Sequence, residues 1–315
     1  MKASYTALVL GLALCASPAA AQYPERAIEF VIPFDAGGSA DIEGRLLAEE
    51  MSAVLGVTVA PVNRPGAGGA LAYSYVNDAE PDGYTVMWTS TSILTITNLG
   101  NVPFGFDALD HIGRVEHQPL VLAVGADSPW SDIESLARDC AGRDQPIRIA
   151  NSGTGSTTHL GALAFMRAVG CEAVHLPIGT RRRNATVLSG EADAMVAPLT
   201  GALSLYRANR LKLLAMLSAQ RNVIIPDVPT ALEHGIDVEF DLFRGLSVPK
   251  GTPADVRARL AEAMTLAGSS EAFQRLADDL GLTVAPLTMG PFEALLQREN
   301  DRVRAIIQSD ITLTR

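Results

Sequence analysis

Short apolar segments alternate with longer amphipathic ones along most of the chain. The apolar segments, bounded by Gly, Pro or polar residues, are the expected strands: 28–33, 57–63, 83–90, 120–124, 147–151, 173–177 and 192–197. The amphipathic segments between them, with apolar positions at helical spacing, are the expected helices: 40–55, 70–79, 131–140, 156–169 and 182–189. This alternation predicts an α/β fold with a mostly parallel sheet covered on both faces.

The alternation runs in two series. The irregular stretch "NVPFGFDALD" (101–110) separates them, and a strand–helix pattern starts again near residue 120. After the apolar segments "LKLLAMLS" and "LFRGLSVP", the remaining C-terminal part is expected to be entirely helical. Two α/β units with a helical tail predict two lobes.

The first 21 residues have the pattern of a secretory signal. Lys2 precedes the apolar run "ALVLGLALCA", and "SPAAAQ" offers small residues for cleavage after Ala21. Cys15 follows Leu14, which is too large for a lipoprotein signal, so we expect a freely released periplasmic protein that begins at Gln22. No later apolar run is long enough to cross a membrane.

The charge of the chain restricts its partners. The net charge of −10 becomes −11 when Lys2, the only charge in the signal, is removed. A protein this acidic is repelled by polyanions, so nucleic acid and anionic membranes are poor partners. An anionic small ligand would need local stabilisation, and we expect a monomer that binds one.

Two cysteines remain in the mature chain, Cys140 and Cys171. In an exported protein they can form a disulfide closing a loop of roughly 30 residues, typically worth about 2–4 kcal/mol. Two buried apolar thiols are an equally good reading of the same sequence.

Two glycine-rich turns each follow an expected strand and precede an expected helix. They are "FDAGGSAD" (34–41) and "NSGTGSTT" (151–158). Backbone N–H groups at a helix start bind anions, and ligands of open α/β sheets gather at the carboxyl ends of strands. Neither turn has the lysine of a phosphate-binding P-loop or the spacing of a dinucleotide fingerprint. A carboxylate held by neutral donors from both lobes is therefore the favoured ligand, and no cofactor is expected.

The sequence resembles the Bug/TctC family of extracytoplasmic solute-binding proteins of tripartite tricarboxylate transporters. The resemblance rests on motifs in the family's order and spacing: "IEFVIPFDAGGSADI", "NRPGAGG", "PDGYTV", "NSGTGSTTHL", "IPDVPTALEHG" and "GLSVPKGTP". It implies a type II periplasmic binding protein, with two lobes joined by crossing strands near 120–124 and 244–248. Lobe 1 would comprise 22–121 and 246–315, and lobe 2 would comprise 122–245.

The resemblance also implies a set of ligand contacts. The first loop would contribute Phe34, Asp35, Ala36, Gly37, Gly38 and Ser39, with Asp41 in a structural role at the helix start. The second loop would contribute Ser152, Thr154, Gly155, Ser156 and Thr157. A side wall at the end of the third strand would contribute Thr89, Ser90, Thr91 and Ser92.

Charged residues near these loops depart from the family pattern. Asp35 stands where a small or neutral residue is usual, so it either points outward or recognises a cationic group. Arg181 to Arg183 follow "LPIG", where relatives often show "YKG". Arg181 is assigned to the cleft to offset Asp35, while a solvated helix start is the alternative. Arg244, on the expected return strand, either contacts the ligand or locks the hinge.

The expected function is capture of a small organic carboxylate (a di- or tricarboxylate or an aromatic acid) and delivery to a membrane permease. A ligand sensor for a membrane receptor kinase is the alternative, and a secreted hydrolase is a weaker one. Ser156 and His159 could share a helix face, but the loop lacks the G-x-S-x-G turn of a serine hydrolase, and His159 fits a capping or packing role better. The histidines lack metal-ligand spacing, so no metal site is expected.

Overall fold

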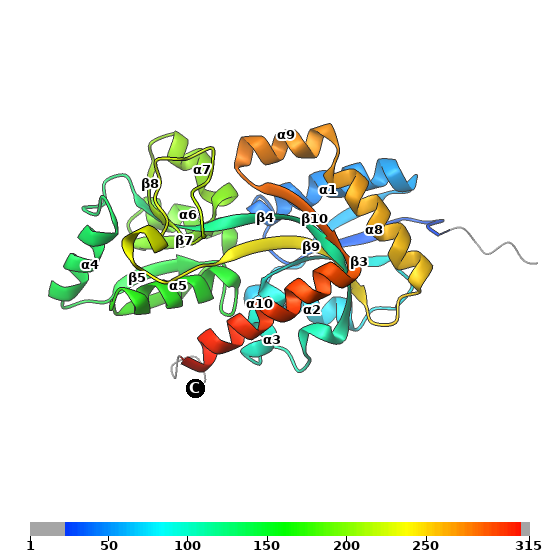
Figure 1. The fold of residues 1–315 in the computed structure, drawn as a ribbon, viewed down its shortest axis with the longest axis horizontal. Helices are drawn as coiled ribbons and strands as arrows, with labels where there is room; N and C mark the ends of the chain where they lie inside the picture. The colour runs from blue at the N-terminus through cyan, green and yellow to red at the C-terminus, as the bar shows by residue number, and fades with distance from the viewer. Residues whose placement is uncertain (1–22, 310–315) are drawn as a thin grey trace, which may run out of the picture.

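The structure is a computed structural model and describes residues 23–309; the expected signal segment 1–21 lies outside the described residues. Two lobes lie side by side, and the long strands β4 (Leu109–Gly125) and β9 (Asp241–Pro249) run between them (Figure 1). Among the described residues, no helix combines the length and apolar composition that a membrane crossing requires. The chain has the mixed α/β fold that the alternation predicts.

The strands of both lobes form one continuous set of pairings. Their order is β2-β1-β3-β9-β4-β7-β5-β6, with β8 and β10 also paired to β4. The pairs β1–β2, β1–β3, β5–β6 and β5–β7 are parallel, while the pairs that involve β4 or β9 are antiparallel. The other strands are β1 (Ile28–Ile32), β2 (Val59–Asn63), β3 (Thr85–Ser90), β5 (Ile147–Asn151), β6 (Ala173–Pro177), β7 (Ala194–Pro198), β8 (Leu211–Met216) and β10 (Thr283–Thr288).

In each lobe, helices cover both faces of the sheet. Lobe 1 contains α1 (Ser39–Leu55), α2 (Ala70–Asn77), α3 (Ser92–Asn98), α8 (Ala254–Gly268), α9 (Glu271–Leu280) and α10 (Met289–Ser309). Lobe 2 contains α4 (Ile133–Gly142), α5 (Thr157–Ala168), α6 (Gly179–Leu188) and α7 (Leu199–Arg207). Each parallel strand is followed by a helix that returns over the sheet, so the turns between them meet at the carboxyl ends of the strands.

Strand β4 joins the two lobes because its two parts have different neighbours. Residues from Leu109 to Pro119 pair with β9, whereas Leu120 to Val124 pair with β7 and also with β8. The change of partner therefore falls at Pro119–Leu120, just before the expected crossing at 120–124. On β9, Arg244 to Ser247 already pair with β3 of lobe 1. The lobe limits expected from the sequence stay a prediction.

Four elements differ from expectation, and one of them, helix α7 (Leu199–Arg207), is not predicted from the sequence. Strand β4 begins inside the stretch 101–110 that looks irregular in sequence. The C-terminal part is not entirely helical, because β10 forms between α9 and α10. This strand is short, partly exposed and contains Pro286, so its alternation is weak; antiparallel pairing with β4 stabilises it. Helix α3 is also absent from the sequence reading, since its seven residues are too few for a clear period.

The two cysteines of the mature chain are joined. Cys140, in α4, and Cys171, just before β6, form a disulfide with a Cα–Cα distance of 5.4 Å. The bond ties the C-terminal turn of α4 to the loop that leads into β6, so it lies within lobe 2.

Candidate functional site

The first glycine-rich loop is shaped by its own side chains. Gly37 adopts φ +80°, and its N–H donates to Asp41 Oδ2 at 2.9 Å. Asp41 Oδ1 accepts from Arg45 Nε at 2.7 Å and from Asn63 Nδ2 at 2.9 Å. Asp41 thus fixes the loop from the first turn of α1, where a carboxylate also interacts favourably with the helix dipole.

Asp35 reaches across to lobe 2. Its Oδ2 atom accepts from Thr180 N at 3.0 Å, from Thr180 Oγ1 at 3.3 Å and from Arg181 N at 3.4 Å, at the N-terminus of α6. A Cβ on Gly179 would lie 2.8 Å from this oxygen, and one on Gly38 would lie 2.8 Å from Thr180 Oγ1. The structure therefore gives Asp35 a role that the sequence reading did not contain: it binds the start of a helix in the opposite lobe.

The amides of the second loop already have partners inside the protein. Ser152 N donates to Thr158 Oγ1 at 2.9 Å, and Gly155 N donates to His159 Nδ1 at 3.1 Å. Thr157 N donates to Ser92 Oγ, which belongs to lobe 1, at 3.3 Å. As an acceptor at Nδ1, His159 is neutral, and burial together with His175 lowers its pKa to about 4. His159 acts here as a cap for the loop.

Backbone contacts bring the loops of the two lobes together. Gly68, in the 3-10 turn Ala67–Gly69 of lobe 1, lies against the second loop so closely that a Cβ on it would be 2.4 Å from Thr154 O. Asn101 Nδ2 donates to Thr154 O at 3.4 Å, and Thr95 Oγ1 donates to Gly155 O. The loops of the two lobes are therefore in direct contact.

A small cavity remains where the lobes meet. Its volume is about 10 Å³, room for about one water molecule. Both lobes and β9 contribute to its lining, which consists of Phe34, Ser39, Ala40, Ser92, Ser152, Ser156, Thr157, Thr158, Thr180, Pro198, Leu242 and Arg244. A neighbouring hollow of about 340 Å³ shares Phe34 and Ser152 with it and includes Asp35 and the turn 65–69.

The cavity contains part of the predicted contact set. Phe34, Ser39, Ser152, Ser156 and Thr157 line it, as does Ser92 of the proposed side wall. The other predicted contacts lie outside its lining: Asp35, Ala36, Gly37, Gly38, Thr89, Ser90, Thr91, Thr154, Gly155 and Arg181.

Thr89, Ser90 and Thr91, the first three residues of the expected side wall, form hydrogen bonds within the protein. Thr89 Oγ1 lies 3.1 Å from Tyr73 Oη, and Ser90 N donates to the same hydroxyl at 2.9 Å. Thr91 Oγ1 bonds to Asp241 O and Phe243 N of β9. These three residues hold β3 to its neighbours, so Ser92 is the member of this group that faces the cavity.

The sequence reading missed several lining residues. Thr158 belongs to the second motif and lies one position beyond the residues chosen. Thr180 is the second residue of α6, and Pro198 is the last residue of β7, so both lie close to strand ends and could have been selected by the same rule. Leu242 lies on β9, where nothing in the sequence distinguishes it from a core residue.

Buried charges connect the cavity to the crossing strands. Arg244, only 1% exposed, pairs through Nε with Glu43 of α1, and the same atom lies 3.7 Å from Glu116 Oε1 on β4. Arg244 Nη2 donates to Ser39 Oγ at 3.1 Å. Burial, and then the Glu43 charge, raise the pKa of Glu116 well above its usual range. Arg244 therefore both fixes the strands at the hinge and lines the cavity.

Of the arginines at the start of α6, Arg183 rather than Arg181 is buried. Arg181 is exposed, whereas Arg183 is 2% exposed and its Nη1 donates to Ser152 Oγ at 2.8 Å. Arg183 does not line the cavity itself, but its guanidinium group is hydrogen-bonded to Ser152, which does.

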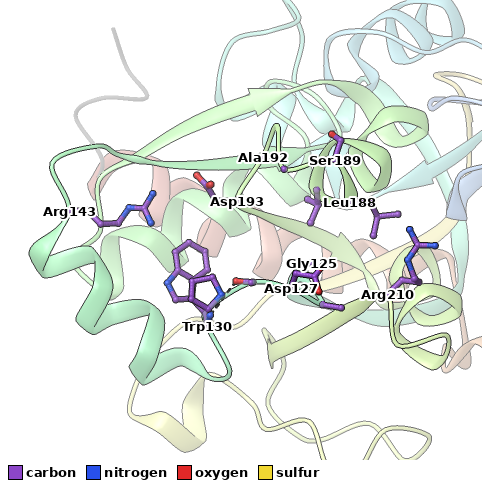
Figure 2. A pocket seen from close by; sticks show the side chains of 14 residues that line it. Gly125, Asp127, Trp130, Arg143, Leu188, Ser189, Ala192, Asp193 and Arg210 are labelled. Atoms are coloured by element: carbon purple, nitrogen blue, oxygen red, sulfur yellow. Dashed lines mark hydrogen bonds between the residues drawn. The ribbon is translucent and has the colours of Figure 1, made fainter.

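A larger hollow, of about 400 Å³, lies in lobe 2 away from the interlobe cavity. Figure 2 shows it between the loop after β4 and the end of α6, with Trp130, Arg143 and Asp193 on one side and Arg210 on the other. Arg143 pairs with Asp139 and Arg148 pairs with Asp193, so charges near it are largely neutralised. It shares no lining residue with the interlobe cavity. The cavity between the lobes is the better candidate site.

Two lobes on crossing strands, with a small cavity between them, define a periplasmic binding protein fold. The sequence model of the family described as "Tripartite tricarboxylate transporter family receptor" (TctC) matches residues 44–312. The chain belongs to this family, which is a family of solute-binding receptors rather than of enzymes. Within the described residues, no group of three His, Cys, Asp or Glu side chains is placed to hold a metal ion.

Named relatives agree with this assignment. Protein BugT of Bordetella pertussis is 31% identical over 245 residues, which are 75% of each protein. The structure of the periplasmic binding protein BugD is 29% identical, with a TM-score of 0.85 over 91% of this chain and 98% of that one. MatC from Rhodopseudomonas palustris, solved with bound malate, is 26% identical, with a TM-score of 0.85 over 90% of this chain and all of that one.

Proposed function

We propose that this protein binds a small organic carboxylate between its two lobes in the periplasm and delivers it to the permease of a tripartite tricarboxylate transporter. The observation that carries the proposal is the interlobe cavity, which is lined by serine and threonine residues of both lobes and by Arg244. Hydroxyls and a guanidinium are donors that suit a carboxylate. The family assignment and the malate-bound neighbour MatC support the same ligand class.

Binding would require the lobes to separate and close again. A cavity of about 10 Å³ cannot hold even a four-carbon acid, so a ligand would replace contacts that the lobes now make with each other. Ser39 and Ser92 of lobe 1 would hold one side of the ligand, and Ser152, Ser156 and Thr157 of lobe 2 would hold the other. The ligand shifts the equilibrium towards closure to the extent that it binds the closed form more tightly.

Delivery to a permease is the part of the proposal that rests on the family alone. The closed pair of lobes would present a surface that the membrane subunits recognise, and opening on the permease would release the acid. A sensing role would use the same closure and differs only in the partner.

A thermal-shift and calorimetric screen of the mature protein (22–315) tests the proposal. Malate, citrate and benzoate represent the acids, with a nucleotide and a divalent cation as comparison compounds. A bound acid should raise the melting temperature by mass action and show saturable binding with one site per chain. If none of the acids shifts the melting temperature while the nucleotide or cation does, the assignment to a carboxylate is wrong.

A further inference from the structure

Arg183 is a buried cation with an incomplete set of partners. Its side chain is 2% exposed, its Nε has no hydrogen-bond partner, and its Nη1 has one, Ser152 Oγ at 2.8 Å. Among the described residues, no carboxylate lies within ion-pair distance of it, and burial without a counter-charge lowers its pKa to about 10. The group therefore remains charged at neutral pH.

Such a charge is unfavourable unless something compensates for it. An uncompensated ion in the protein interior costs several kcal/mol, which is why buried arginines are normally paired. Arg244, the other fully buried arginine of this region, has Glu43 and Glu116 beside it. The local packing nevertheless accommodates Arg183, because Gly201 of α7 leaves space: a Cβ there would lie 2.9 Å from Arg183 Nη2.

Ser152 connects this cation to the cavity. Its Oγ accepts the hydrogen bond from Arg183, and Ser152 is one of the residues that line the cavity between the lobes. Since a hydroxyl oxygen that accepts this bond still has its own proton, the Ser152 O–H can donate into the cavity. The adjacent guanidinium polarises that O–H and strengthens its bond to an anion.

We propose that Arg183 and Ser152 form a cationic subsite in lobe 2 that binds one carboxylate group of the ligand, so that an ionised carboxylate at this end is required for tight binding. This inference rests on the proposed function and names the residue that selects the ligand. The carboxylate accepts the Ser152 O–H and supplies the counter-charge that Arg183 lacks. Closure over an anion is thereby favoured relative to closure over an uncharged molecule.

The test compares Arg183→Met with Arg182→Met in the mature protein. Methionine keeps much of the side-chain length but removes the charge; Arg182 is exposed on the same helix, so its variant changes the net charge equally without touching the cavity. With malate as the probe, calorimetry should show affinity lower by about tenfold or more in Arg183→Met and unchanged in Arg182→Met. Melting without ligand should be the same or higher in Arg183→Met, because an uncompensated charge is removed.

Two further measurements do not depend on how that variant folds. Ser152→Ala should weaken malate binding in the same direction, and the wild-type protein should bind malate more tightly than malamide, which has the same shape without charge. The subsite would be overturned if Arg183→Met bound malate as tightly as the wild type does, or if the wild type bound malate and malamide equally tightly. Either result would leave the proposed function intact. If the wild type binds none of malate, citrate and benzoate, both proposals fail.

Discussion

Asp35 in lobe 1 and Thr180 in lobe 2 are joined by a hydrogen bond of 3.0 Å between a carboxylate oxygen and a backbone N–H. The carboxylate lies at the N-terminus of α6, where the helix dipole favours a negative charge. A residue that looked unfavourable beside an anion site therefore makes a contact between the two lobes. Its charge interacts with the start of α6.

Replacing Asp35 should open the protein. Asp35→Ala removes the acceptor of the first amides of α6, a loss of about 1 kcal/mol from the closed form. Small-angle X-ray scattering without ligand should show a larger radius of gyration than for the wild type. Glu80→Ala is the control, since Glu80 is exposed and carries the same charge. An unchanged radius in Asp35→Ala would mean that this contact does not hold the lobes together.

Gly68 should be required for closure. Gly68→Ala places a Cβ 2.4 Å from the Thr154 carbonyl oxygen of the other lobe, so the lobes must move apart. Ligand affinity should fall by about tenfold or more, measured by calorimetry with an acid that the wild type binds. Gly100→Ala is the matched control, because Gly100 has a similar φ of +71° against +67° but no atom within 4 Å of the added carbon.

Both glycine variants carry the same backbone strain, about 1 kcal/mol. Gly68→Ala should lose at least as much free energy of unfolding as Gly100→Ala, because it also disturbs contacts between the lobes, and only Gly68→Ala should lose affinity. Equal affinity in the two variants would show that the Gly68 contact is dispensable for binding.

Glu116 should make stability depend on pH. Burial raises its pKa in the folded state, so the folded protein keeps this proton where the unfolded chain has lost it. The contribution is present below the ordinary carboxyl pKa and is lost as pH rises from there through the raised value. Urea unfolding at a series of pH values should show a smaller decline in Glu116→Gln than in the wild type across this window. If the free energies of unfolding of Glu116→Gln and the wild type changed with pH in the same way, this account would be contradicted.

The disulfide should stabilise lobe 2 without contributing to binding. Cys140 and Cys171 are separated by 31 positions, and neither lines the interlobe cavity. The double variant Cys140→Ala/Cys171→Ala should lose about 2–4 kcal/mol in urea unfolding, and reduction of the wild type should have the same effect. Affinity for the ligand should be unchanged. An unfolding midpoint equal to that of the oxidised wild type would refute the stabilising role.

The sequence predicts the regular alternation well because period and turn residues are local signals. Strands such as β1 and β5 and helices such as α1 and α5 are expected near their observed positions. The beginning of β4 and the whole of β10 are not predicted from the sequence, since their stability comes from pairing with strands distant in the sequence. For the same reason, the exact place where the chain crosses between lobes depends on partners that the sequence does not display.

The site is harder to predict than the fold. Both glycine-rich turns lie at the lobe interface, but bonds such as Gly37 N to Asp41 and Thr157 N to Ser92 depend on side-chain orientation. Arg183 could have been distinguished from Arg181 by spacing, because it precedes the buried Thr186 and Val187 by three and four positions on one helix face. The proximity of Arg183 to Ser152 could not have been predicted from the sequence, since the two residues are 31 positions apart.

Strand β4 is seventeen residues long and pairs with neighbouring strands in both lobes. The strand continues through Pro119, where its partners change. Melting either lobe would strip half of this strand of its neighbours and expose its apolar side chains to water. The two lobes are therefore expected to lose their structure as one cooperative unit.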